Sequence, residues 1–195
     1  NVLALGSLYP ETVQIVTLAD SGIHSVEDLA GKKVSVGAPG SGTYINAQQI
    51  LEIYGMDIET DIKAQHLDFD ASVGGLQDGT IDAAFITAGT PTGSVQGLAT
   101  TNPVKIVPMD KDKIDALVSK YPFYAAETVA KGTYDGLEED VDTVAVLAML
   151  AVSKDLSEDD VYKIAKAIYE NVDKLTHQKK EFIKLENALN GIGVD

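Results

Sequence analysis

The sequence has 195 residues, 45% of them hydrophobic, which is typical of one ordinary domain or two small lobes with an apolar core. Thirty acidic residues against fifteen lysines, with no arginine, give a net charge of −15, which opposes binding to nucleic acids and to anionic membranes. The absence of cysteine excludes thiol catalysis, thiolate zinc sites and disulfide bonds.

The first elements are predicted from short apolar runs. A strand is expected over residues 13–19 and another over residues 32–37, because both are apolar and bounded by turn residues. Between them, Ser25 with Asp28 three positions later indicates a short helical turn that ends at Gly31.

The stretch VSVGAPGSGTYINAQQILEIYG, residues 34–55, reads as a strand, a loop of small residues and a helix. The helix places Ala47, Ile50, Leu51 and Tyr54 on one face and ends at Gly55.

The remaining chain continues the alternation of strands and helices. Strands are expected within residues 62–68, 80–89 and 104–109, and helices within residues 70–79, 90–103 and 112–121. This order predicts a doubly wound α/β sheet. Residues 121–142 are expected to be a connector.

After this connector the sequence predicts a strand over residues 143–153 and a helix over residues 156–175. Ser157 and Asp160 form a capping box at the start of the helix. Its apolar stripe, which we expect to be buried, consists of Val161, Ile164, Ala165, Ile168, Val172 and Leu175.

The glycine loop does not fit a nucleotide site. Gly37 and Gly42 are spaced as in a phosphate-binding loop, but Thr43 follows where that motif has lysine. Ser41, Gly42 and Thr43 instead precede a helix, whose free amides and dipole favour a carboxylate. In the alternative interpretation, Ser41 or Thr43 only caps its own helix.

A second loop has the same design. Thr87, Ala88, Gly89 and Thr90 end a strand, and Pro91 follows near the start of a helix. Because ligands of open α/β sheets bind beyond the carboxyl ends of strands, we expect the two loops to form one polar cup. The alternative is a plain strand-to-helix turn.

The sequence offers no catalytic residue, metal site or cofactor site. The three histidines are scattered, and no Ser/His/Asp set or nucleophile elbow is present. The acidic residues 138–142 are expected to be solvated, with weak calcium binding as an alternative.

Several collinear segments resemble the TAXI family, the solute-binding proteins of TRAP (tripartite ATP-independent periplasmic) transporters. They are LGSLYPETVQIV, ADSGIHSVEDLAGKKVSVGAPGSGT, LQDGTIDAAFITAGTPTG, YPFY and GTYDGLEEDVDTVAV. The resemblance implies an α/β, periplasmic binding protein-like type II fold: a two-lobed clamp of doubly wound sheets, here with lobe one incomplete. It implies that residues 1–30 belong to lobe one and the crossover, residues 31–140 to lobe two, and residues 141–195 to lobe one again.

The resemblance also implies a function and a site. The protein would be a monomeric, non-enzymatic receptor, periplasmic or extracellular after removal of a signal peptide, or held at the membrane surface of a Gram-positive cell. It would pass a small carboxylate, a glutamate-like amino acid or a dicarboxylate, to TRAP membrane subunits. The expected ligand-binding residues are Tyr9, Ser41, Gly42, Thr43, Thr87, Ala88, Gly89 and Thr90. The alternatives are an enzyme on a related α/β fold that acts on a small anion and a sensory solute-binding domain.

Overall fold

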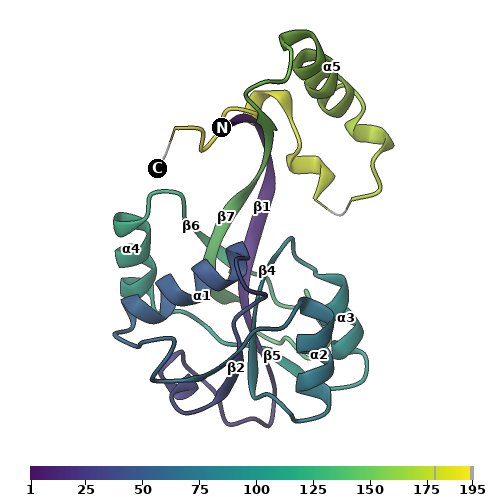
Figure 1. Ribbon diagram of the computed structural model, residues 1–195. Helices are drawn as coiled ribbons and strands as arrows, with labels where there is room; N and C mark the ends of the chain where they lie inside the picture. Colours follow the sequence, from purple (N-terminus) through teal and green to yellow (C-terminus); the bar gives the residue numbers. More distant parts are fainter. Residues whose placement is uncertain (178, 194–195) are drawn as a thin grey trace.

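Two long strands connect the two parts of the molecule. The computed structural model describes residues 1–177 and 179–193. Strands β1 (Val2–Leu18) and β7 (Val141–Ser153) run antiparallel from a larger α/β part to a smaller helical part (Figure 1). The α/β part comprises strands β2 to β6 and helices α1 to α4, and the helical part comprises helix α5 and the turns that follow it. Strand β1 exceeds the predicted residues 13–19 because its first half also pairs with β7.

One mixed sheet forms the centre of the α/β part. The strand order is β3-β2-β4-β1-β7-β6, and β5 also pairs with β1. Strands β2 and β3 run parallel to each other, as do β2 and β4, whereas β1 is antiparallel to β4, β5 and β7. The shorter strands are β2 (Lys33–Ser35), β3 (Lys63–Gln65), β4 (Ala83–Ala88), β5 (Val104–Ile106) and β6 (Ala125–Val129).

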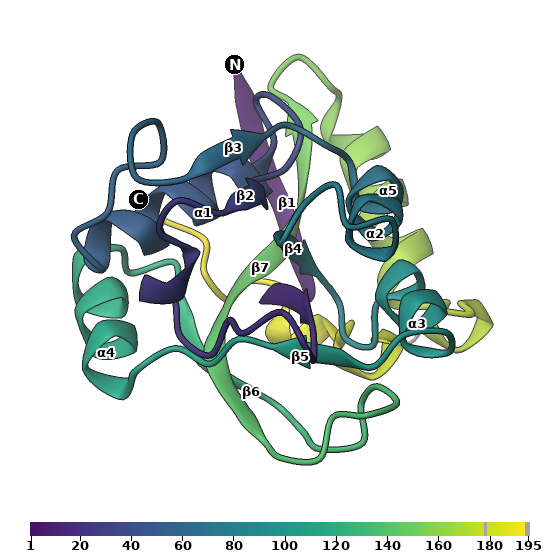
Figure 2. The same ribbon diagram turned by 90° about the horizontal axis from the view of Figure 1, so that it is seen from below.

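Helices cover both faces of this sheet, so the predicted α/β fold class is confirmed. Helices α1 and α4 lie on one side, and α2 and α3 lie on the other (Figure 2). Phe85 and Ile86 are consecutive residues of β4 and belong to different core clusters, because neighbouring side chains of a strand point to opposite faces. The helices are α1 (Gly42–Ile53), α2 (Phe69–Gln77), α3 (Gly93–Ala99) and α4 (Lys111–Lys120).

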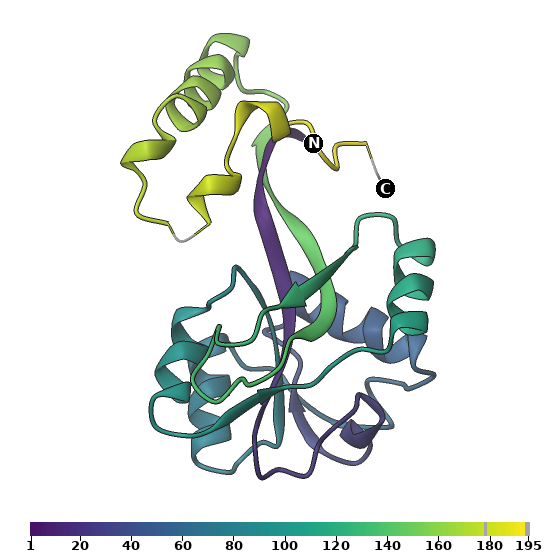
Figure 3. The same ribbon diagram turned by 180° about the vertical axis from the view of Figure 1, so that it is seen from behind.

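Strand β6 corrects the prediction of a connector over residues 121–142. It pairs antiparallel with β7, from Ala125 opposite Ala145 to Val129 opposite Val141 (Figure 3). Its side chains are mostly exposed, as at many sheet edges, so the sequence of β6 shows no apolar alternation.

The helical part contains α5 (Glu158–Tyr169) and short 3-10 turns. Its capping residue is confirmed: Ser157 Oγ accepts a hydrogen bond from the Asp160 amide at 3.2 Å. The predicted buried stripe is wrong, because no residue of α5 is buried and the Ile164 side chain is 38% exposed. The helix also ends at Tyr169, six residues before the predicted end, and 3-10 turns follow at Val172–Lys174, Lys180–Phe182 and Leu185–Asn187. Another 3-10 turn, Glu27–Leu29, matches the short turn predicted near Ser25.

Candidate functional site

The glycine loop holds the start of α1 in a fixed geometry. Ser41 is the N-cap, and its Oγ accepts a hydrogen bond from the Tyr44 amide at 3.2 Å. Gly37 and Gly40 have φ angles of +88° and +74°, a conformation that side chains rarely adopt. The cap uses an oxygen lone pair of Ser41, which leaves the hydroxyl hydrogen as a potential donor at the positive end of the helix dipole.

The two predicted loops end at the same edge of the sheet. Val34 lies opposite Ala83 and Ser35 lies opposite Ala84, so parallel strands β2 and β4 lead into both loops. A side-chain hydrogen bond joins β4 to α1: Thr87 Oγ1 of β4 donates to Asn46 Oδ1 of α1 at 3.0 Å. The structure therefore brings the loops together. The hydroxyl hydrogen of Thr87 is already donated to Asn46.

A buried hydrogen-bond chain continues from Asn46. Its Nδ2 donates to Tyr124 Oη at 2.6 Å, and Tyr124 Oη donates to Gln49 Oε1 at 2.7 Å. Burial raises the pKa of Tyr124 to about 12, which keeps this hydroxyl protonated and able to donate. The sequence analysis missed this chain; the one local signal is that polar Asn46 lies beside Ala47 on the predicted buried face.

A second network fixes the turn between β4 and α3. The fully buried Gln14 donates from Nε2 to Thr92 Oγ1 at 2.9 Å and accepts at Oε1 from Tyr134 Oη. Tyr134 Oη accepts from the Thr92 amide at 2.8 Å, and Thr92 Oγ1 donates to the Gly89 carbonyl at 3.0 Å. These bonds join residues up to 120 positions apart, so no sequence motif indicates them.

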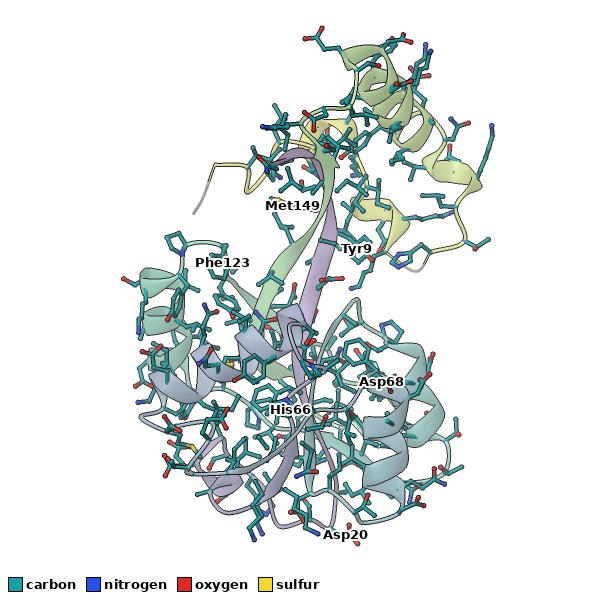
Figure 4. All side chains as sticks on the ribbon, in the orientation of Figure 1. Tyr9, Asp20, His66, Asp68, Phe123 and Met149 are labelled. Atoms are coloured by element: carbon teal, nitrogen blue, oxygen red, sulfur yellow. The ribbon has the colours of Figure 1, made fainter. Side chains whose placement is uncertain are left out.

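Beside this turn lies a cavity of about 340 Å³ between the α/β part and the helical part. Tyr9 projects from β1 between the two parts (Figure 4). A β-carbon on Gly89 would lie 3.1 Å from Lys179 Cγ and 3.7 Å from Tyr9 Cε2, which shows how close these groups come. The cavity is lined by Tyr9, Glu11, Ala88, Gly89, Pro91, Thr92, Gly93, Thr176, His177 and Lys179.

The predicted site residues thus fall into two groups. Tyr9, Ala88 and Gly89 line the 340 Å³ cavity. The other predicted residues do not line it: Ser41, Gly42 and Thr43 begin α1, Thr87 bonds to Asn46, and Thr90 precedes Pro91 in the turn. The sequence analysis missed Glu11 of β1 and the residues that the helical part adds to the cavity, Thr176, His177 and Lys179.

The cavity carries charged and aromatic groups. Burial raises the pKa of the Glu11 carboxyl. Burial and then the nearby negative charge of Glu11 raise the pKa of Tyr9. The rings of Tyr9 and His177 lie 4.5 Å apart at an angle of 32°. Polar, charged and aromatic groups therefore converge on a space large enough for a small organic molecule.

A second cavity of about 480 Å³ is mainly apolar and includes Pro10, Phe123, Tyr124, Leu147 and Met149. Phe123 and Met149 lie on the side of the long strands away from Tyr9 (Figure 4). Pro10 lies between Tyr9 and Glu11 in β1, so the two cavities use opposite faces of this strand.

The structure gives no support to calcium binding by residues 138–142. Asp140 accepts a hydrogen bond from the Lys131 amide, and Asp142 accepts one from Thr128 Oγ1. Within the described residues, no group of three or more His, Asp or Glu side chains could hold a metal ion. No described helix is long and apolar enough to cross a bilayer.

Solved structures with a TM-score of 0.50 share the fold. Arginine-bound truncated ArgBP from T. maritima is 17% identical, with 86% of this chain and 58% of that chain covered. GshT, from a study of glutathione import in Streptococcus mutans, is 16% identical, with coverage of 94% and 64%. The periplasmic sulfonate-binding protein SsuA from Methylobacillus flagellatus KT is 15% identical, with coverage of 92% and 46%. This chain therefore spans about half to two thirds of the length of these structures.

The mixed open sheet, the helices on both of its faces and these structural relatives define a type II periplasmic solute-binding fold. Within this class the family is clear from sequence. The profile of the NMT1-like family matches residues 1–195, and the chain belongs to this family.

Proposed function

We propose that the protein is an extracytoplasmic receptor that binds a small carboxylate and delivers it to a membrane permease. The solute-binding fold and the NMT1-like family support a receptor. The cavity of about 340 Å³ carries the proposal, because three of the residues expected from sequence, Tyr9, Ala88 and Gly89, line it together.

The carboxylate would bind at the start of α1, which does not line this cavity but follows β2 at the same sheet edge as the turn after β4. The amides of Gly42 and Thr43 are among the first four of the helix, which lack acceptors within it. The Ser41 hydroxyl hydrogen adds a donor, and the helix dipole adds partial positive charge. This attraction is local, which an anion needs on a protein with a net charge of −15.

The division into lobes is part of the same proposal. Residues 31–140 would form lobe two, and residues 1–30 and 141–195 would belong to lobe one and the crossover. Strands β1 and β7 would act as the hinge, since they connect the two parts of the molecule (Figure 1). The receptor would bind without chemical conversion, as a monomer in the periplasm or at the cell surface, and the TRAP membrane subunits would be its partners.

Calorimetric titration of the full-length protein with small mono- and dicarboxylates tests the site. Ser41→Ala combined with Thr43→Val should weaken binding by roughly 1–3 kcal/mol, because two hydroxyls that meet a charged ligand are removed. Valine preserves the volume of Thr43, whose side chain is buried.

Ser157→Ala is the matched control for loss of a helix cap. Ser157 caps α5 with the same 3.2 Å bond from Oγ to an amide, but it lies in the helical part. Loss of this cap in Ser157→Ala should leave the affinity for the carboxylate unchanged. Equal affinity of the wild type and the Ser41/Thr43 variant would refute the carboxylate site, and product formation from a bound carboxylate would refute a receptor without enzymatic activity.

A further inference from the structure

The cavity beside Tyr9 contains a carboxylate, that of Glu11, for which the described residues supply no ion-pair partner. Glu11 lines this cavity from β1, where it pairs with Val146 of β7. Among the described residues, no ion pair includes Glu11. Burial raises the pKa of its carboxyl.

Lys179, the lysine that lines the cavity, is not an ion-pair partner of Glu11. Lys179 lies within reach of Gly89, but its Nζ is 5.3 Å from the ring centroid of Phe182. A cation over an aromatic face is already partly stabilised. Glu11 and Lys179 thus line the same space as separate charges of opposite sign.

We propose that Glu11 is the specificity-determining residue for a positively charged group of the solute, a protonated amine. This inference rests on the proposed receptor function and selects, within the class of small carboxylates, those that also carry an amine. An ammonium in the cavity would meet the Glu11 carboxylate and the aromatic ring of Tyr9, two groups that attract cations. A carboxylate solute without an amine would leave Glu11 unpaired and would gain nothing from it.

Pairs of ligands with the same carbon skeleton test the assignment. Calorimetric titration of the full-length protein at pH 7 compares glutamate with glutarate, aspartate with succinate, and leucine with 4-methylpentanoate. In the pair that binds best, the amine should lower Kd by roughly tenfold or more, the usual scale for a hydrogen bond to a charged group. Glu11→Gln should remove most of this preference by weakening the amine-bearing ligand and leaving its partner within about twofold.

Glu127→Gln is the matched control. Glu127 lies on β6 and lines the apolar cavity on the other face of the long strands, so its loss of charge should leave the preference unchanged. The wild-type comparison needs no variant and remains decisive if Glu11→Gln does not fold.

The two proposals fail in different ways. Equal or tighter binding of the amine-free acid by the wild type, or a preference that persists in Glu11→Gln, would overturn the role of Glu11 and leave the receptor proposal standing. If none of the carboxylates binds, the proposed function itself fails, and the assignment of Glu11 fails with it.

Discussion

Replacing Gly37 by alanine should be one of the most damaging single changes in the glycine loop. A β-carbon at this position would lie 2.8 Å from Thr43 Cβ and 2.9 Å from Ser41 Oγ. Thr43 is only 6% exposed and cannot easily move away. The φ angle of +88° adds backbone strain for any residue other than glycine.

The magnitude follows from these two costs. The left-handed backbone conformation costs an alanine about 1–2 kcal/mol. The forced contact with Thr43 adds about 1–3 kcal/mol, the usual range for overpacking. The free energy of unfolding should therefore fall by about 2–5 kcal/mol. At roughly 2–4 °C per kcal/mol for a chain of this size, Tm should fall by about 4–20 °C.

Gly40→Ala separates the two costs. Gly40 has a similar φ angle of +74°, but a β-carbon there would meet no atom within 4 Å beyond its chain neighbours, so only the backbone cost of about 1–2 kcal/mol applies. Urea unfolding followed by circular dichroism measures both variants. If Gly37→Ala loses no more stability than Gly40→Ala, the close packing of Gly37 on Thr43 is refuted.

Two further predictions concern stability. Tyr134→Phe should lower the free energy of unfolding by about 1–3 kcal/mol, because the Thr92 amide and Gln14 Oε1 lose their partner; urea unfolding that matches the wild type would contradict this network. For Glu11, the folded state holds the carboxyl proton more tightly than the unfolded state, so its charge destabilises the fold as pH rises above the ordinary pKa of 4.5. Glu11→Gln should therefore raise Tm by about 1–2 °C at pH 7 and should lose this advantage below pH 4.5; in thermal melts at both pH values, an unchanged difference would refute the assignment.

Much of the α/β part could be predicted from local patterns. The order of strands and helices after Lys32, the cap at Ser41 and the cap at Ser157 all follow from residues close in sequence. These features depend on side-chain periodicity and on hydrogen bonds that span a few positions. Strand β6 was not predicted, because its exposed residues show no such periodicity and its pairing with β7 is a tertiary contact.

The candidate site was only partly predictable for the same reason. Sequence patterns located both loops, and the resemblance to TAXI proteins added Tyr9. They could not indicate that Asn46 bonds to Thr87, or that Glu11 and Lys179 line one cavity with Gly89. The burial of the α5 stripe was predicted wrongly, because amphipathic periodicity identifies an apolar face without specifying what covers it.

The sequence by itself determined where the strands and helices form, apart from β6 and the first half of β1, and which loops contain small residues, because backbone preferences and capping act over a few neighbouring positions. Only the tertiary structure decided which loops meet, which polar groups are buried as partners, and which charges share a cavity. Those outcomes depend on strand pairing, as between β2 and β4 and between β1 and β7, and on side-chain bonds between residues 41 to 120 positions apart, and no local pattern encodes them.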